Sequence, residues 1–177
     1  FKNIRKLEPG CTINFSSPSD VPETQPYWSA EDTIIQGLRN PFSGTQQEGI
    51  DELERLLLNS VKQQMLADVP LGVFLSGGVD SSLVTCLMEA QTSYPVHTFS
   101  IGFHEKEYNE AENSKEVANY LGTKHTEFYI TSKDALEAIP KIPSIFSEPF
   151  SDSSQIPTYI LSKLARQHVV VALSGDG

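Results

Sequence analysis

The residues with the clearest chemical potential form a short polar cluster, Ser76-Gly77-Gly78-Val79-Asp80-Ser81-Ser82. Two adjacent glycines mark a turn, and a turn of this kind can point several backbone N–H groups at one anion. If a helix begins directly afterwards, its N-terminal dipole adds positive potential at the same place. The three serine hydroxyls supply further donors. The cluster therefore predicts a binding site for an anion such as a phosphate.

Asp80 adds a requirement to this prediction, because a carboxylate repels a bare phosphate. A divalent cation between the two removes that repulsion, and Asp80 is accordingly the candidate metal ligand. The alternative is a carboxylate that only stabilises the helix dipole. The cluster differs from the common phosphate loop, G-x-x-x-x-G-K-[ST], because no lysine follows the glycines. An ordinary strand-to-helix turn is the plain alternative for the whole stretch.

An added Cβ at Gly78 is expected to damage nucleotide binding more than loss of the Ser82 hydroxyl does. The side chain would crowd the approach of the backbone to a phosphate, and a positive φ is expected there.

The elements that must position this cluster alternate along the chain. Apolar runs predict strands at 73–75, 96–101, 125–130 and 169–173. Amphipathic or capped segments predict helices at 48–66, 81–90, 109–121 and 157–167, and a helical stretch at 132–146 that Pro140 and Pro143 interrupt. Strands that alternate with helices indicate an α/β fold, a doubly wound parallel sheet with helices on both faces.

A second Ser-Gly pair follows the last predicted strand, in Leu173-Ser174-Gly175-Asp176. In a doubly wound sheet, ligands bind beyond the carboxyl ends of the strands, where the strand order reverses. If the two strands are neighbours, the loops at Ser76 and Ser174 form one site. Asp176 either faces the substrate or only accepts from turn amides. Glu148 and Asp152 lie in a polar loop, where they either orient an amine or metal, or cap the turn.

The first 47 residues differ in character from the rest. Residues 1–15 predict short strands around a turn at Pro9-Gly10, and residues 16–47 are rich in Ser, Pro, Gly and Thr without a sustained period. We interpret residues 16–47 as a linker or surface loop, so the first residues are expected to end a preceding domain.

The composition narrows the class of protein. The 177 residues suffice for one domain with a core, and a formal net charge of −10 argues against duplex DNA or an anionic membrane as a partner. Cys11 and Cys86 have no disulfide or metal spacing, which favours a reducing, cytoplasmic location. Cys86 is expected in the core. His97 and His125 lie in predicted strands, where a hydrogen-bonded structural role is favoured over catalysis.

The glycine cluster resembles the pyrophosphate loop of the N-type ATP pyrophosphatases, an element shared by GMP, NAD and argininosuccinate synthetases. The wider pattern from Glu48 to Gly177 resembles the glutamine-hydrolysing asparagine synthetases. The motifs that carry this resemblance are Val69–Leu75, Phe99–Phe103, Leu121–His125, Glu148–Asp152, Ile156–Tyr159 and Val171–Gly177. Ile4–Gly10 resembles the close of that family's glutaminase domain. Residues 1–46 are then the end of a glutaminase domain plus a linker, and residues 47–177 the N-terminal part of a synthetase domain.

The resemblance implies a fold of the adenine nucleotide alpha hydrolase type and a reaction in two steps. ATP adenylates a carboxylate, which is aspartate in asparagine synthesis, and glutamine-derived ammonia attacks the acyl-adenylate. By position, Mg²⁺ and pyrophosphate would be held by Ser76, Gly77, Gly78, Asp80 and Ser81. Adenosine would meet the backbone of Phe74, Leu75 and Ile101, with Ser174 and Gly175 against the nucleotide. Asp176 would be the catalytic residue facing the acceptor.

Departures from the family pattern leave other expectations open. Residue 1 is Phe1, whereas the family's glutaminase nucleophile is an N-terminal cysteine, and Cys11 is not in that role. A further metal-binding acid and later catalytic residues would follow Gly177, so the chain is expected to be a fragment that makes no amide alone. A relative that amidates another carboxylate and a nucleotide-binding fragment without turnover are the alternatives. The residues leave the oligomeric state open, with a homodimer as one option.

Overall fold

The computed structural model describes residues 2, 4–17, 19, 22–103, 111–146, 148 and 151–175. The chain consists of two compact units, Phe1–Asp51 and Glu52–Gly177, each of which makes most of its contacts internally. Helix α2 (Gln46–Gln64) contains the boundary between them. Among the described residues, none of the helices is both long and apolar enough to cross a bilayer.

The first unit contains a small two-stranded sheet and a helix. Strand β1 (Cys11–Ile13) pairs antiparallel with β2 (Thr24–Pro26), and the Gly10 carbonyl accepts from the N–H groups of Tyr27 and Trp28. Helix α1 (Ala30–Arg39) begins after Ser29, whose hydroxyl accepts from the Asp32 N–H. None of its residues is buried.

Two expectations for this unit were wrong. The Pro9-Gly10 turn precedes β1 rather than joining two strands, and residues 16–47 contain both β2 and α1. Strand β2 is too short to show a period of apolar residues. Helix α1 is stabilised by its local cap, and its apolar residues Ile34 and Leu38 remain exposed, so the composition of this stretch did not indicate a helix.

The second unit is built on a parallel sheet of four strands. The strands are β3 (Leu71–Phe74), β4 (His97–Phe103), β5 (Lys124–Ile130) and β6 (Val171–Leu173). Their order is β5-β4-β3-β6, and every pairing is parallel. The chain steps outward from β3 to β5 and then returns to the other side of β3. This reversal confirms the predicted doubly wound α/β fold.

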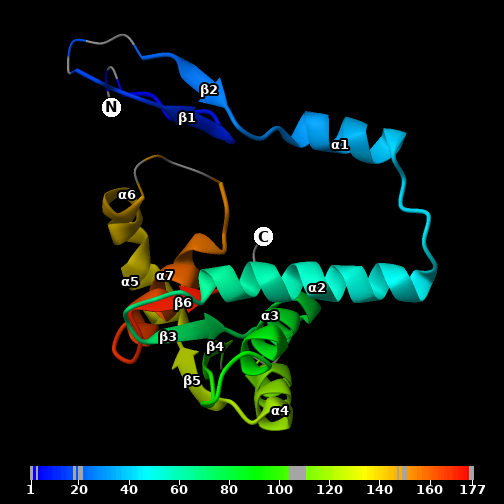
Figure 1. Ribbon diagram of the computed structural model, residues 1–177. Helices are drawn as coiled ribbons and strands as arrows, with labels where there is room; N and C mark the ends of the chain where they lie inside the picture. The colour runs from blue at the N-terminus through cyan, green and yellow to red at the C-terminus, as the bar shows by residue number, and fades with distance from the viewer. Residues whose placement is uncertain are drawn as a thin grey trace. The chain divides into compact units, whose positions relative to one another are not determined.

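Helices cover both faces of the sheet (Figure 1). On one face, Val61 of α2 and Met88 of α3 (Val79–Glu89) pack with Val73. Helix α4 (Ala111–Leu121) contacts α3, β4 and β5. On the other face, Phe99 packs with Ala165 of α7 (Gln155–Ala165), and α5 (Ser132–Ala138) contributes Ala138 to the adjacent cluster. Burying apolar strand faces under helices is the main source of stability in such a layer.

Among the smaller features, one agrees with the sequence-based expectation and several differ from it. As predicted, the two prolines divide the 132–146 stretch into α5, a 3₁₀ turn η2 (Ile139–Lys141) and α6 (Ile142–Ile145). Strand β4 continues through Gly102 instead of ending there, and β6 begins at Val171 rather than at residue 169. Cys86 is exposed on α3, so the prediction that it lies in the core was wrong. The predicted N-cap of α4, Asn109, lies outside the described residues.

Candidate functional site

The carboxyl ends of β3 and β6 lie side by side at the point where the strand order reverses. Val73 is the parallel partner of Leu173. The chain therefore leaves both strands in the same direction, with Leu75-Ser76 after β3 and Ser174-Gly175 after β6. This pairing confirms that the two Ser-Gly loops are neighbours. A reversal of strand order is where an open α/β sheet leaves room for a ligand.

The loop after β3 is held together by short-range hydrogen bonds. Ser76 and Ser81 join their hydroxyl oxygens at 2.9 Å, and the Ser76 N–H donates to Ser81 Oγ at 3.1 Å. The Gly78 N–H donates to Ser76 Oγ at 3.2 Å. Helix α3 then begins with Gly78 as its N-cap, and Gly78 makes no side-chain cap. The first amides of a helix have no intrahelical acceptor, so this loop places such amides at the end of the sheet.

Gly77 carries the unusual backbone conformation of this loop. Its φ is +80°, and a Cβ there would lie 2.7 Å from the Ser114 backbone nitrogen and from the Asn113 Cβ. Gly78 has φ −73°, so the expectation of a positive φ at Gly78 was wrong. The tight turn is made one residue earlier, where the loop passes against α4. A Cβ on Gly78 would meet only the Ser76 hydroxyl, at 3.3 Å.

Gly175 brings the second loop against the first. A Cβ at Gly175 would lie 2.6 Å from the Ser81 nitrogen and 3.0 Å from the Asp80 carbonyl carbon. No side chain larger than hydrogen fits there without moving the start of α3. Gly175 and Ser174 are half-buried. The two loops thus form one continuous surface of backbone and small side chains.

The side chains of Phe74 and Ile101 are partly buried against core clusters, and the side chain of Leu75 is buried. The side chain of Phe74 packs with Phe99, and that of Ile101 packs with Ile130 and Ile160. Leu75 is 1% exposed, and its N–H donates to the Phe99 carbonyl at 2.8 Å. A ligand at the ends of β3 and β4 would therefore meet main-chain groups of these residues.

Asp80 is an exposed carboxylate in the first turn of α3. Searching the described residues finds no group of three or more His, Cys, Asp or Glu side chains able to hold a metal ion. Mg²⁺ commonly takes one or two protein carboxylates together with phosphate oxygens and water. A single exposed carboxylate such as Asp80 can take part in a site of that kind. The other predicted acid, Asp176, lies outside the described residues.

Two further polar groups that the sequence singled out are placed by the structure. Ser82 Oγ is buried, with no hydrogen-bond partner in the described part of the chain. Asp152 Oδ1 accepts from the Ser154 N–H at 2.8 Å, and this bond holds the pKa of the carboxyl below its usual value. Asp152 thus caps its turn, which was one of the two expected roles. The exposed Glu148 keeps both alternatives open.

Sequence reasoning missed the support that α4 gives to the glycine loop. Asn113 and Ser114 lie directly behind Gly77, and Ser114 is fully buried, with its hydroxyl donating to the Ala111 carbonyl at 2.9 Å. The sequence pattern that could have pointed to this contact was the predicted helix after β4. That pattern indicated a helix at 109–121, but it did not indicate which loop the helix contacts.

The sequence model of the asparagine synthase family matches residues 52–177. The chain belongs to this family. It is 40% identical to a putative glutamine-hydrolyzing asparagine synthetase 2 of Methanocaldococcus jannaschii, over 100% of this chain and 33% of that protein. It is 32% identical to asparagine synthetase 1 of Bacillus subtilis, over 99% of this chain and 26% of that protein. The chain therefore spans about a third or less of these relatives.

Among solved structures, the chain is similar to an NMN synthetase from Francisella tularensis. The TM-score is 0.46 at 16% identity, over 67% of this chain and 50% of that one. An NH3-dependent NAD synthetase from Campylobacter jejuni gives a TM-score of 0.45 at 13% identity, over 66% and 52% of the two chains.

Proposed function

We propose that this chain contributes the nucleotide site of an enzyme that amidates aspartate to asparagine, with ATP as the activating substrate and ammonia derived from glutamine. The observation that carries the proposal is the contact between the two Ser-Gly loops at the reversal of strand order. Family membership supports the choice of reaction, and the relatives named above are called glutamine-hydrolyzing asparagine synthetases.

Pyrophosphate is proposed to lie in the loop of Ser76, Gly77, Gly78, Asp80 and Ser81. The N-terminal amides of α3 favour an anion there, and the helix dipole adds to this preference. Mg²⁺, when bound between Asp80 and the phosphates, would neutralise charge that develops on the leaving group. Adenosine is proposed to lie against the backbone of Phe74, Leu75 and Ile101, beside Ser174 and Gly175.

The proposed chemistry proceeds through an acyl-adenylate. A carboxylate is a poor electrophile, so its oxygen first attacks the α-phosphorus of ATP, and the bond to the bridging oxygen breaks to release pyrophosphate. Ammonia then attacks the acyl carbon, and AMP leaves with the former carboxylate oxygen. The chain's part in these steps is to orient the phosphates and stabilise the departing charge. Asp176 remains proposed as the acidic residue facing the acceptor.

The path of the carboxylate oxygen tests the mechanism. The full-length protein would be supplied with ATP, Mg²⁺, an ammonia source and aspartate labelled with ¹⁸O in its side-chain carboxylate, and the AMP analysed by mass spectrometry. Transfer of one ¹⁸O to AMP is expected. ADP and phosphate as products would contradict adenylation. AMP formed only with another carboxylate would show that the acceptor is not aspartate.

We further propose that residues 1–177 bind ATP but make no amide alone. Residues 1–46 are assigned as the end of a glutaminase domain with its linker, and residues 47–177 as the first part of the synthetase domain. The test compares pyrophosphate release by these 177 residues and by the full-length protein, with aspartate and ammonium. Equal turnover by the two would show that the acceptor site is already complete.

A further inference from the structure

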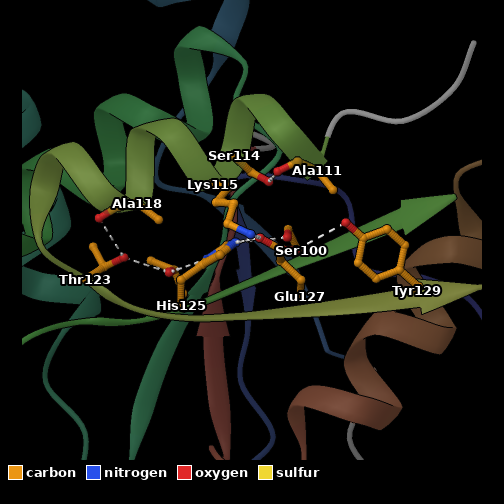
Figure 2. A network of polar contacts seen from close by, with 10 residues as sticks. Ser100, Ala111, Ser114, Lys115, Ala118, Thr123, His125, Glu127 and Tyr129 are labelled. Carbon is orange, nitrogen blue, oxygen red and sulfur yellow. Dashed lines mark hydrogen bonds and ion pairs between the residues drawn. The ribbon is translucent and has the colours of Figure 1, made fainter. Parts of the chain in front are cut away.

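A connected polar network lies between α4 and the edge of the sheet (Figure 2). At its centre is His125 of β5, whose Nδ1 lies 2.7 Å from Thr98 Oγ1 and whose Nε2 lies 3.1 Å from Ser100 Oγ. Thr98 and Ser100 of β4 are buried, with 0% and 2% of their surface exposed. The imidazole therefore bonds two hydroxyls that have no access to water.

The direction of these hydrogen bonds follows from where the network ends. Thr123 Oγ1 donates to the Ala118 carbonyl, a pure acceptor. With the Thr123 proton on this 3.4 Å contact, Thr123 accepts from Thr98 at 2.8 Å and Thr98 accepts from His125 Nδ1–H, which is the order of donors that we assign to the network. Neutral imidazole carries one proton, so Nε2 accepts from Ser100. The network thus selects the neutral ring with its proton on Nδ1.

Charged groups approach this ring from β5 and α4. On β5, Glu127 Oε1 lies 3.9 Å from His125 Nε2, and Lys115 Nζ of α4 lies 3.5 Å from the same oxygen. Tyr129 donates to Glu127 Oε2 at 3.2 Å, and the charge of Glu127, with a smaller effect from Glu112 of α4, raises the pKa of Tyr129.

These surroundings have a net effect on the imidazole. Burial lowers the pKa of His125, and the charge of Lys115 lowers it too, whereas Glu127 opposes them. The neutral ring is therefore the form favoured in the folded protein.

The network touches the candidate site through two elements. Lys115 directly follows Asn113 and Ser114, the residues behind Gly77 in the glycine loop. Ser100 directly precedes Ile101, whose backbone is proposed to meet adenosine. The same ring and its carboxylate partner therefore hold both the helix that supports the phosphate loop and the end of β4.

We propose that His125 is a positioning residue for the nucleotide site: in its neutral form it fixes the end of β4 and, through Glu127 and Lys115, the start of α4 against the glycine loop. This inference rests on the proposed function, because it assigns a role toward ATP. His125 touches neither ATP nor the reacting atoms.

Protonation would undo this arrangement in a defined way. A proton on Nε2 leaves Ser100 without its acceptor, so the hydroxyl must turn. The imidazolium also attracts Glu127 and competes with Lys115 for its carboxylate. ATP affinity should therefore be full above the ordinary histidine pKa of 6.5 and fall as the pH drops through the lowered pKa of His125.

The test measures MgATP affinity by calorimetry between pH 5 and 8 in the full-length protein, for wild type, His125→Gln and His97→Gln. His97 is the matched control, since it also lies on a strand with a pKa lowered by burial. At pH 8, His125→Gln should bind about fivefold more weakly, as expected for losing one hydrogen bond. Because ATP itself takes up protons, the readout is each variant's affinity relative to wild type. This ratio should approach one for His125→Gln at low pH and stay constant for His97→Gln.

Four further outcomes keep the inference separable from folding and from the proposed function. The rate at saturating ATP should be unchanged in His125→Gln, since only positioning of ATP is affected. Glu127→Gln should weaken ATP binding, whereas Glu137→Gln, in an exposed pair with Lys133, should not. Wild-type affinity at every pH in both His125→Gln and Glu127→Gln overturns the inference alone. No ATP binding by wild type overturns the proposed function and this inference together.

Discussion

Two polar regions of the second unit, the glycine loop and the His125 network, are stabilised in different ways. In the glycine loop, the side-chain hydrogen bonds join residues no more than five positions apart, as between Ser76 and Ser81. In the network, His125 bonds residues 25 and 27 positions away. The loop leaves Gly78 and Asp80 exposed, whereas the two hydroxyls that His125 bonds, those of Thr98 and Ser100, are buried. Exposed local structure suits contact with a ligand, and buried long-range structure suits support.

This difference separates what each region should do when it is altered. A change in the loop should affect ATP directly, with a loss of binding that does not depend on the pH. A change in the network should act through the position of α4 and β4 and should depend on the charge of one ring. The following predictions test this separation, from the largest expected effect to the smallest.

Gly77→Ala should have the largest effect, on both folding and binding. The alanine must adopt φ near +80° and also place its Cβ 2.7 Å from α4. Strain and overpacking together should lower the free energy of unfolding by about 2–4 kcal/mol. Gly122→Ala is the matched control, because Gly122 also has a positive φ, +76°, but has open space around it. Urea denaturation should show a loss of only about 1 kcal/mol in the control. Equal losses would argue against the contact with α4.

Gly78→Ala should weaken ATP binding without unfolding the protein. Its φ is compatible with alanine, and the added Cβ meets one hydroxyl only, so stability should change by less than about 0.5 kcal/mol. The methyl group would displace a phosphate from the loop amides, and we expect at least about tenfold weaker binding. Ser82→Ala should bind as wild type, since the hydroxyl it removes is buried and has no hydrogen-bond partner among the described residues. Similar affinities in the two variants would remove the case for backbone binding.

Asp80→Asn should remove the metal dependence of ATP binding. Wild type should bind ATP more tightly with Mg²⁺ than with excess chelator, because Asp80 is proposed to hold the cation and Mg²⁺ would offset the repulsion between the carboxylate and the phosphates. In the variant, calorimetry should give nearly the same affinity under both conditions. If the variant kept the full dependence of ATP affinity on Mg²⁺, Asp80 would only stabilise the dipole of α3 and would not bind the metal. Asp51→Asn, on the exposed side of α2, is the control for the change of charge.

The smallest expected effect is the acid sensitivity of folding that His125 confers. Its pKa is lowered in the folded protein, so the unfolded chain takes up the proton first as the pH falls. The contribution of His125 to stability should thus be complete above pH 6.5 and decline below it, levelling off beneath the lowered pKa. Thermal unfolding of His125→Gln should show a shallower loss of stability over this range than wild type. If the stability of the two proteins fell equally with pH, the claim that the folded protein keeps the His125 ring neutral would be contradicted.

The elements that position the site were predictable because their signals are local. The apolar run before Ser76, the glycine pair and the helix after it lie within one continuous stretch, and the repeated alternation of strands and helices predicted the parallel sheet. The sequence could not show that the loops at Ser76 and Ser174 are neighbours, because packing decides the order of the strands. The pairing of Val73 with Leu173 in the structure shows that they are.

The features that were missed depend on contacts between distant parts of the chain. Gly77 rather than Gly78 adopts the positive φ, because the loop must pass against Asn113 and Ser114. Cys86 faces outward although its neighbours Leu87 and Met88 are buried, since a core stripe on α3 is narrow. The bonds of His125 to two hydroxyls of β4 depend on strand register, which no local pattern reveals.

The most direct test of the account is to locate bound ATP by backbone amide chemical shifts in the ¹⁵N-labelled protein. On addition of MgATP, the largest changes should occur at Gly77, Gly78, Asp80, Ser81 and Gly175, the residues of the two loops that meet at the ends of β3 and β6. Smaller changes should reach Ser114 and His125. Large changes confined to other parts of the sheet, with these five amides unaffected, would contradict a nucleotide site at the joined loops.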